Sequence, residues 1–143
     1  MGNVASKKLP IVEGLLSLSD SGPHLIGSKC PSCGAYFFPK GSYCPDLKCK
    51  RTALEEVALS TRGKLYTYTV QYYLPPPPYK FDGDFSPYAI GLIELPEGIR
   101  VLGQLAGCDP KEIQIGMEVE LIAEKQFTDD QGNEYMMWKF RRA

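Results

Sequence analysis

Residues 30–34 read Cys-Pro-Ser-Cys-Gly, and residues 44–49 read Cys-Pro-Asp-Leu-Lys-Cys. Two residues separate the first pair of cysteines and four separate the second, with ten residues between the pairs. Two such turns on neighbouring loops bring four thiolates together in a tetrahedron, the ligand set that Zn²⁺ prefers in structural sites. Because residues 28–50 have no long apolar period, this stretch needs a metal staple in order to fold.

The four clustered cysteines, Cys30, Cys33, Cys44 and Cys49, are therefore predicted to bind a structural zinc ion. Two disulfides and an iron site are the alternatives that the spacing also allows. The chain has 5 cysteines, an odd number, and its first residues lead into no apolar segment of a secretory signal, which disfavours disulfides. With four thiolate ligands the zinc has no open position for water or substrate, so we expect it to hold the fold only. Gly34 is expected to supply the positive φ that turns backbone N–H groups toward the sulfurs.

The composition is that of a globular protein of 143 residues, with 43% hydrophobic and 23% charged residues. This length fits one compact unit or two very small ones and is too short for a catalytic thiolase, kinase or dehydrogenase fold. No stretch approaches the ~20 apolar residues of a membrane span. We expect a cytoplasmic protein.

The charges are nearly balanced, at −1, but unevenly distributed. Residues 1–71 hold nine basic and five acidic residues, whereas residues 72–143 hold seven basic and twelve acidic ones. A general nucleic-acid binder usually has a strongly basic domain, which this chain lacks. One local basic cluster remains, formed by Lys48, Lys50, Arg51, Arg62 and Lys64.

From residue 63 onward the sequence is typical of strands, which makes the expected fold class mainly β. Five segments are rich in β-branched and aromatic residues or alternate apolar and polar residues. A short helical turn is predicted between the third and fourth of them, with Asp109 as N-cap and Pro110 at the first helical position. This order predicts a five-stranded OB-type barrel, with an SH3-like barrel or an open sandwich as the alternative. The segments are 64–73, 88–95, 99–106, 117–123 and 134–142.

Residues 11–20 follow Pro10 and place Ile11, Leu15 and Leu18 at helical spacing, which predicts a short helix. Such a helix is unstable alone and must dock on another element. The predicted organisation is an N-terminal helical arm over residues 1–24, a rubredoxin-like zinc ribbon over 25–55 and an OB-fold barrel over 56–143.

Residues 72–88 form a loop rich in proline and aromatic residues. A loop of this length is usually functional or disordered, and disordered loops are poor in aromatics. Tyr79, Phe81 and Phe85 are therefore expected either to fold back over the barrel mouth or to contact a partner or ligand.

The remaining reactive side chains do not form a catalytic set. Cys108 has no detectable base, and the only histidine, His24, lies far from it in the sequence. The chain also lacks a Gly-rich phosphate loop, so we predict no catalytic residue and no activity of the chain alone.

Several motifs together resemble a known family. They are Cys30-Pro-Ser-Cys33-Gly, Tyr36-Phe37-Phe38-Pro39, Cys44-Pro45, the segment 63–70 (Gly-Lys-Leu-Tyr-Thr-Tyr-Thr-Val), the segment 88–95 (Tyr-Ala-Ile-Gly-Leu-Ile-Glu-Leu) and the segment 101–105 (Val-Leu-Gly-Gln-Leu). The likeness covers roughly residues 10–142. It is to the small proteins that join an N-terminal helix, a rubredoxin-like zinc ribbon and an OB-fold.

The resemblance implies a non-catalytic accessory subunit of a thiolase-type acyl-CoA enzyme. Members clamp the thiolase-fold subunit, help to shape its acyl-CoA site and accompany thiolases in pathways that include anaerobic toluene breakdown. The expected partners are thus a thiolase-fold protein and an acyl-CoA. The five residues of the basic cluster are then expected to meet either CoA phosphates or an acidic rim on the partner.

Two other functions remain open at this stage. A stand-alone acyl-CoA or lipid carrier would use an apolar barrel mouth lined by the aromatic loop. A nucleic-acid module would stack bases on Tyr66, Tyr68 and Tyr72, although the acidic charge of the barrel opposes it.

Overall fold

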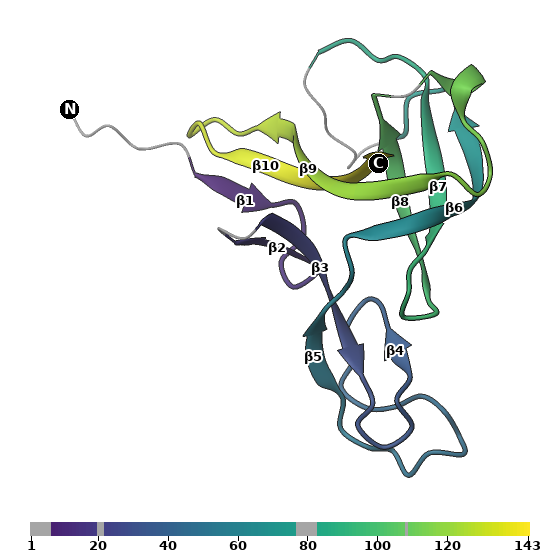
Figure 1. Cartoon of the computed structure of the whole chain (residues 1–143). Coiled ribbons are helices and arrows are strands. Elements are labelled where there is room, and N and C mark those ends of the chain that lie inside the picture. Colours follow the sequence, from purple (N-terminus) through teal and green to yellow (C-terminus); the bar gives the residue numbers. More distant parts are fainter. Residues whose placement is uncertain (1–6, 20–21, 77–82, 108) are drawn as a thin grey trace.

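The protein is a zinc-ribbon-like projection on a small β-barrel (Figure 1). The computed structural model describes residues 7–19, 22–76, 83–107 and 109–143. Its strands are β1 (Lys8–Pro10), β2 (Leu16–Ser19), β3 (Gly22–Lys29), β4 (Tyr36–Phe37), β5 (Glu55–Ala58), β6 (Arg62–Gln71), β7 (Tyr88–Glu94), β8 (Arg100–Ala106), β9 (Glu118–Thr128) and β10 (Glu134–Arg142). A 3₁₀ turn, η1 (Pro110–Glu112), connects β8 to β9.

Strands β6 to β10 close into the predicted five-stranded barrel. Antiparallel pairings join β6 to β7, β7 to β8, β9 to β10 and β6 to β9. A parallel pairing of β8 with β10, which sets Gln104 opposite Lys139, completes the ring. Closure leaves no unpaired sheet edge around the barrel, and it confirms the OB-type fold.

The turn before β9 is also as predicted from the sequence. Asp109 is the N-cap of η1 and accepts a hydrogen bond from the Lys111 backbone N–H, with Pro110 in the first turn. Strand β9 runs five residues further than the 117–123 segment, because its antiparallel ladder with β10 continues to Thr128 past a bulge at Tyr135 and Met136.

Two glycines let the barrel close around its core. Gly91 of β7 lies opposite Gly103 of β8. A Cβ atom on Gly103 would lie 2.5 Å from Cδ2 of Phe140, a side chain with no exposed surface. Glycine in a strand interior often marks such a close approach, and here it makes room for the largest buried ring.

The predicted N-terminal helix is wrong. Leu16–Ser19 form β2 and pair antiparallel with β3, while residues 11–15 are a turn in which Gly14 has a φ of +86°. The apolar residues also fit a two-residue period, since Leu16 is buried and Leu18 packs against the core. Strand pairing with β3 satisfies the backbone groups that a lone short helix leaves unpaired at its ends.

The ribbon consists of β3, β4 and β5 and shares the hydrophobic core of the barrel. Both β4 and β5 pair antiparallel with β3. Leu16, Leu25 and Leu59 belong to the same buried cluster as Leu121 and Phe140 of the barrel. The ribbon base is therefore fixed to the barrel by packing.

Two further contacts tie the N-terminal part to β10. Strand β1 pairs parallel with β10, with Lys8 opposite Glu134. Phe38 of the ribbon meets Trp138 edge-on, with ring centroids 6.0 Å apart.

The described part of the chain contains no helix long and apolar enough to cross a membrane.

We expect Gly103→Ala to lower the free energy of unfolding by about 1–3 kcal/mol, because Phe140 has to shift to admit the methyl group. Gly41→Ala is the matched control, since its Cβ would meet only Leu54 at 3.4 Å. Urea denaturation of both variants measures the difference. Equal stability of the two variants would contradict the close approach.

Candidate metal centre

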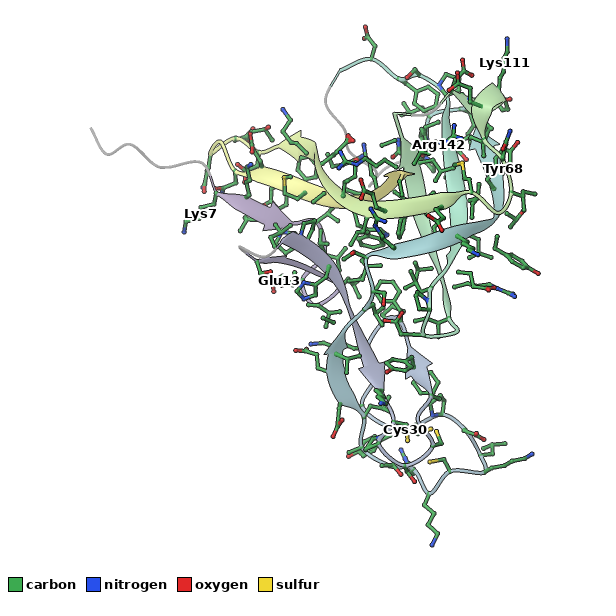
Figure 2. The ribbon with its side chains drawn as sticks, viewed as in Figure 1. Lys7, Glu13, Cys30, Tyr68, Lys111 and Arg142 are labelled. Atoms are coloured by element: carbon green, nitrogen blue, oxygen red, sulfur yellow. The ribbon has the colours of Figure 1, made fainter. Side chains whose placement is uncertain are left out.

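The four clustered cysteines meet at the end of the ribbon farthest from the barrel, where Figure 2 labels Cys30 among other sulfur atoms. Cys30 follows β3 directly, and Cys33 lies in the turn after it. Cys44 and Cys49 come from the long connection between β4 and β5. All four Sγ atoms lie within 4.8 Å of one another.

The spacing of the sulfurs fits a metal and excludes disulfides among these four residues. The Sγ atoms of Cys30 and Cys49 are 3.7 Å apart, and those of Cys33 and Cys44 are 3.8 Å apart. A tetrahedron with Zn–S bonds of ~2.3 Å has edges of about 3.8 Å. A disulfide needs a separation of ~2.05 Å, and all four cysteines are free. The donor set thus fits a structural zinc ion, and the disulfide alternative is wrong.

The first knuckle, which is the turn formed by residues 30–34, is built as the sequence predicts. Gly34 has a φ of +77° and donates its N–H to the Cys30 carbonyl oxygen at 2.8 Å. The Cys33 N–H lies 3.4 Å from Cys30 Sγ and donates to it. The turn therefore directs backbone dipoles at a sulfur that carries negative charge in a metal complex.

The second knuckle, formed by residues 44–52, is also held by hydrogen bonds of its backbone, although it contains no glycine. The Asp46 carboxylate accepts from the Lys48 N–H at 2.9 Å, and the Asp46 carbonyl accepts from the Cys49 N–H at 3.0 Å. Arg51 takes the positive φ, 44°, in this loop. Thr52 Oγ1 lies 3.5 Å from Cys49 Sγ. Sequence reasoning missed Asp46 and Thr52. An Asp that can accept from the backbone N–H two residues later, and a Thr three residues after a metal ligand, are recognisable signals.

The thiol pKa values show how the cluster behaves before metal binds. The backbone N–H of Cys33 is the main cause that lowers the pKa of Cys30 to about 6. The pKa of Cys44 is raised to about 12: the Asp46 backbone N–H lowers it, but burial and the three neighbouring cysteines raise it more. Several thiolates in one place repel one another unless a cation replaces their protons.

A zinc ion bound here would be held by all four cysteines and would cross-link the two knuckles. Four sulfur ligands leave it no site for substrate, so the centre has a structural role. The chain's own residues position the sulfurs: the Cys33 N–H donates to Cys30, and Thr52 Oγ1 is in hydrogen-bond contact with Cys49.

The five cations of the basic cluster fall into two groups. Arg62 and Lys64 lie on β6 among carboxylates: Arg62 is 3.6 Å from Glu120, and Lys64 lies opposite Glu94 of β7 and Glu118 of β9. Arg141 also donates to Glu120, at 2.7 Å, and this hydrogen bond is the main cause that lowers the pKa of Glu120. Opposite charges paired across neighbouring strands stabilise the barrel surface.

Lys48, Lys50 and Arg51 form the other group, on the second knuckle. All three are exposed, and none forms an ion pair with a residue that the structure describes. Arg51 lies over the Tyr43 ring, 5.3 Å from its centroid. Unlike Arg62 and Lys64, these three cations have no carboxylate opposite them on a neighbouring strand, which leaves them open to a binding partner.

The aromatic loop is described only in part. Tyr79, Phe81 and also Cys108 lie outside the described residues. Phe85 is half-buried and meets Tyr88 at the start of β7 edge-on, with centroids 6.1 Å apart. Tyr72, Tyr73 and Leu74 are exposed.

Comparison with known proteins identifies the two parts of the chain. Residues 23–55 match the family model "ChsH2, rubredoxin-like zinc ribbon domain", and residues 56–123 match "ChsH2, C-terminal OB-fold domain". The chain belongs to the DUF35 family of ChsH2-type zinc-ribbon and OB-fold proteins. The two matches confirm the rubredoxin-like ribbon and the OB-type barrel that the sequence predicted for this chain.

The chain is similar to proteins that are named as scaffolds and subunits. A "DUF35 domain-containing scaffold protein" of Methanocaldococcus jannaschii is 44% identical over 68% of this chain and 66% of its own length. The "Benzoylsuccinyl-CoA thiolase subunit BbsA" of Thauera aromatica is 36% identical over 84% of this chain and 77% of its own. The structure titled "Ltp2-ChsH2(DUF35) aldolase" superimposes with a TM-score of 0.64 and 30% identity, covering 83% of this chain and 84% of that one.

We expect purified protein to carry about one zinc ion per chain, and Cys33→Ser to lose it, because three thiolates bind zinc more weakly than four. Cys108→Ser, outside the cluster in sequence, is the control and should retain the metal. Elemental analysis by mass spectrometry measures both. Metal-free protein with a fully folded ribbon would overturn the assignment.

Zinc binding to the metal-free protein at pH 7.5 should release protons, because the Cys44 thiol, with a pKa of about 12, is protonated until the metal displaces its proton. The apparent affinity for zinc should accordingly rise with pH. Titration calorimetry in two buffers of different ionisation enthalpy measures the released protons. The same heat in both buffers would contradict this prediction.

Proposed function

We propose that this DUF35 chain is a non-catalytic accessory subunit of a thiolase-type acyl-CoA enzyme. The observation that carries the proposal is its likeness, over 84% of its length, to a protein named as a subunit of benzoylsuccinyl-CoA thiolase. The structural neighbour titled as an Ltp2-ChsH2(DUF35) aldolase supports the same kind of role.

The chemistry of the described residues supports a subunit without its own reaction centre. The metal site has four sulfur donors and leaves no open coordination position. His24, the only histidine in the sequence, lies opposite Ser17 in the β2–β3 pairing, and its side chain makes no hydrogen bond to a described residue. A nucleophile needs such a base within hydrogen-bond reach.

Contact with the acyl-CoA is a finer part of the proposal. The exposed second-knuckle cations Lys48, Lys50 and Arg51 form no ion pair with a described residue, so they are free to meet either CoA phosphates or an acidic rim on the partner. Arg62 of β6 is already paired with Glu120. Phe85, beside Tyr88, is the described member of the aromatic set proposed to reach the partner or the acyl-CoA. A place in aromatic (toluene) degradation is supported by the likeness to BbsA.

The two other functions have less support. The barrel interior is filled by packed side chains such as Ile93, Val101 and Phe140, which leave no room there for a carried acyl chain. The apolar pocket lined by Tyr88, Leu102 and Trp138 opens to solvent and does not enclose a ligand. For base stacking, Tyr68 packs against the core and Tyr66 lies under Arg100, 3.7 Å from its guanidinium, which breaks the proposed aromatic platform.

We expect the tagged chain, expressed in its native cell, to co-purify with a thiolase-type subunit in a fixed ratio, as its likeness to a protein named as a thiolase subunit implies. Mass spectrometry and light scattering identify the partner and the stoichiometry. The isolated chain should neither turn over a thioester nor bind CoA in titration calorimetry. Thioester turnover by the isolated chain would overturn the proposal, and tight CoA binding by it would favour the carrier function.

A further inference from the structure

The tip of the second knuckle presents an apolar side chain to solvent. Leu47 is fully exposed, at 101%, the highest exposure among the large hydrophobic residues described. Tyr43, at the start of the same loop, is 55% exposed. Single exposed apolar residues are common on protein surfaces, so exposure alone assigns no role to Leu47.

The backbone around Leu47 is held in place, which makes the residue suited to binding. Asp46 and Lys48 on either side of it are linked by a hydrogen bond of 2.9 Å, and Cys49 donates to the Asp46 carbonyl at 3.0 Å. Cys44 and Cys49, which bracket the loop, are both members of the four-sulfur cluster. An apolar side chain on a pre-ordered turn loses little conformational entropy when it is buried against a partner.

The charges around Leu47 indicate what kind of surface would bury it. Lys48, Lys50 and Arg51 have no carboxylate partner among the described residues, and Asp46 is the loop's only acid. A zinc ion with four thiolates carries two negative charges, so with zinc bound the tip is close to neutral overall. A neutral tip produces little long-range attraction for polyanions such as nucleic acid or an anionic membrane. Its separate cations instead suit carboxylates placed at matching positions at short range.

We propose that the second-knuckle tip, with Leu47 as its apolar anchor and Lys48 and Lys50 at its rim, docks into an apolar pocket bordered by Asp or Glu on the thiolase-type subunit. This inference rests on the proposed function. In this inference, the zinc centre holds the second-knuckle tip in the conformation that binds the partner. An apolar anchor surrounded by a polar rim is the usual arrangement at the energetic centre of a protein interface.

The test uses the full-length, zinc-loaded chain and the thiolase-type subunit identified by co-purification. Leu47→Ala should raise the dissociation constant of the complex about tenfold or more, which is the loss of affinity expected when one leucine is no longer buried. Lys48→Glu with Lys50→Glu should raise the dissociation constant further and reduce its dependence on salt concentration. Ile115→Ala, which removes a 67% exposed apolar side chain from the barrel, and Lys111→Glu on η1 are the matched controls and should change the constant less than twofold.

The outcomes separate this inference from the proposed function. Zinc content and urea stability should be unchanged in all variants, which excludes misfolding as the cause. If the subunit binds and Leu47→Ala binds equally well, the docking tip is wrong and the subunit role stands. If no thiolase-type subunit binds at all, both fail. If wild-type protein binds vesicles of phosphatidylcholine and phosphatidylserine and Leu47→Ala abolishes only that binding, the tip is a membrane anchor and the inference is overturned.

Discussion

The convergence of four sulfur atoms is the interaction on which the ribbon depends. Between β3 and β5 the chain buries only two residues, and both are ligands, Cys30 and Cys44. A segment with so little apolar burial cannot offset the entropy of ordering its backbone. The cluster, whose four sulfur atoms lie within 4.8 Å of one another, supplies that missing stabilisation when a cation replaces the thiol protons.

The barrel, by contrast, is stabilised by packing and then extends that packing to the ribbon base. Leu25 and Leu59 join the cluster that contains Phe140, and β1 adds a parallel pairing to β10. The metal-held tip is consequently attached to a closed barrel through a shared core. Such an arrangement suits a protein whose function is to hold a surface in position, because little conformational freedom is lost when a partner binds.

The sequence predicted those features whose cause is local. The cysteine spacing, the N-cap at Asp109 and the β-branched run of β6 all act within a few residues. The N-terminal segment misled because Leu15 and Leu18 fit a helical period, whereas Leu16 and Leu18 fit a strand period, and so short a length does not distinguish the two. The pairing of Arg62 with Glu120 depends on the register of β6 with β9, between residues 58 positions apart. No local pattern encodes that register, so the basic cluster looks continuous in the sequence, although Arg62 is paired with Glu120 in the fold.

The most direct test of this account compares the affinity of the zinc-loaded and metal-free full-length chain for its thiolase-type subunit, for example by biolayer interferometry. The account predicts that removing the metal abolishes binding while the barrel stays folded by circular dichroism, and that adding zinc restores binding. Equal affinity of the two forms would contradict the idea that the metal exists to hold a docking surface.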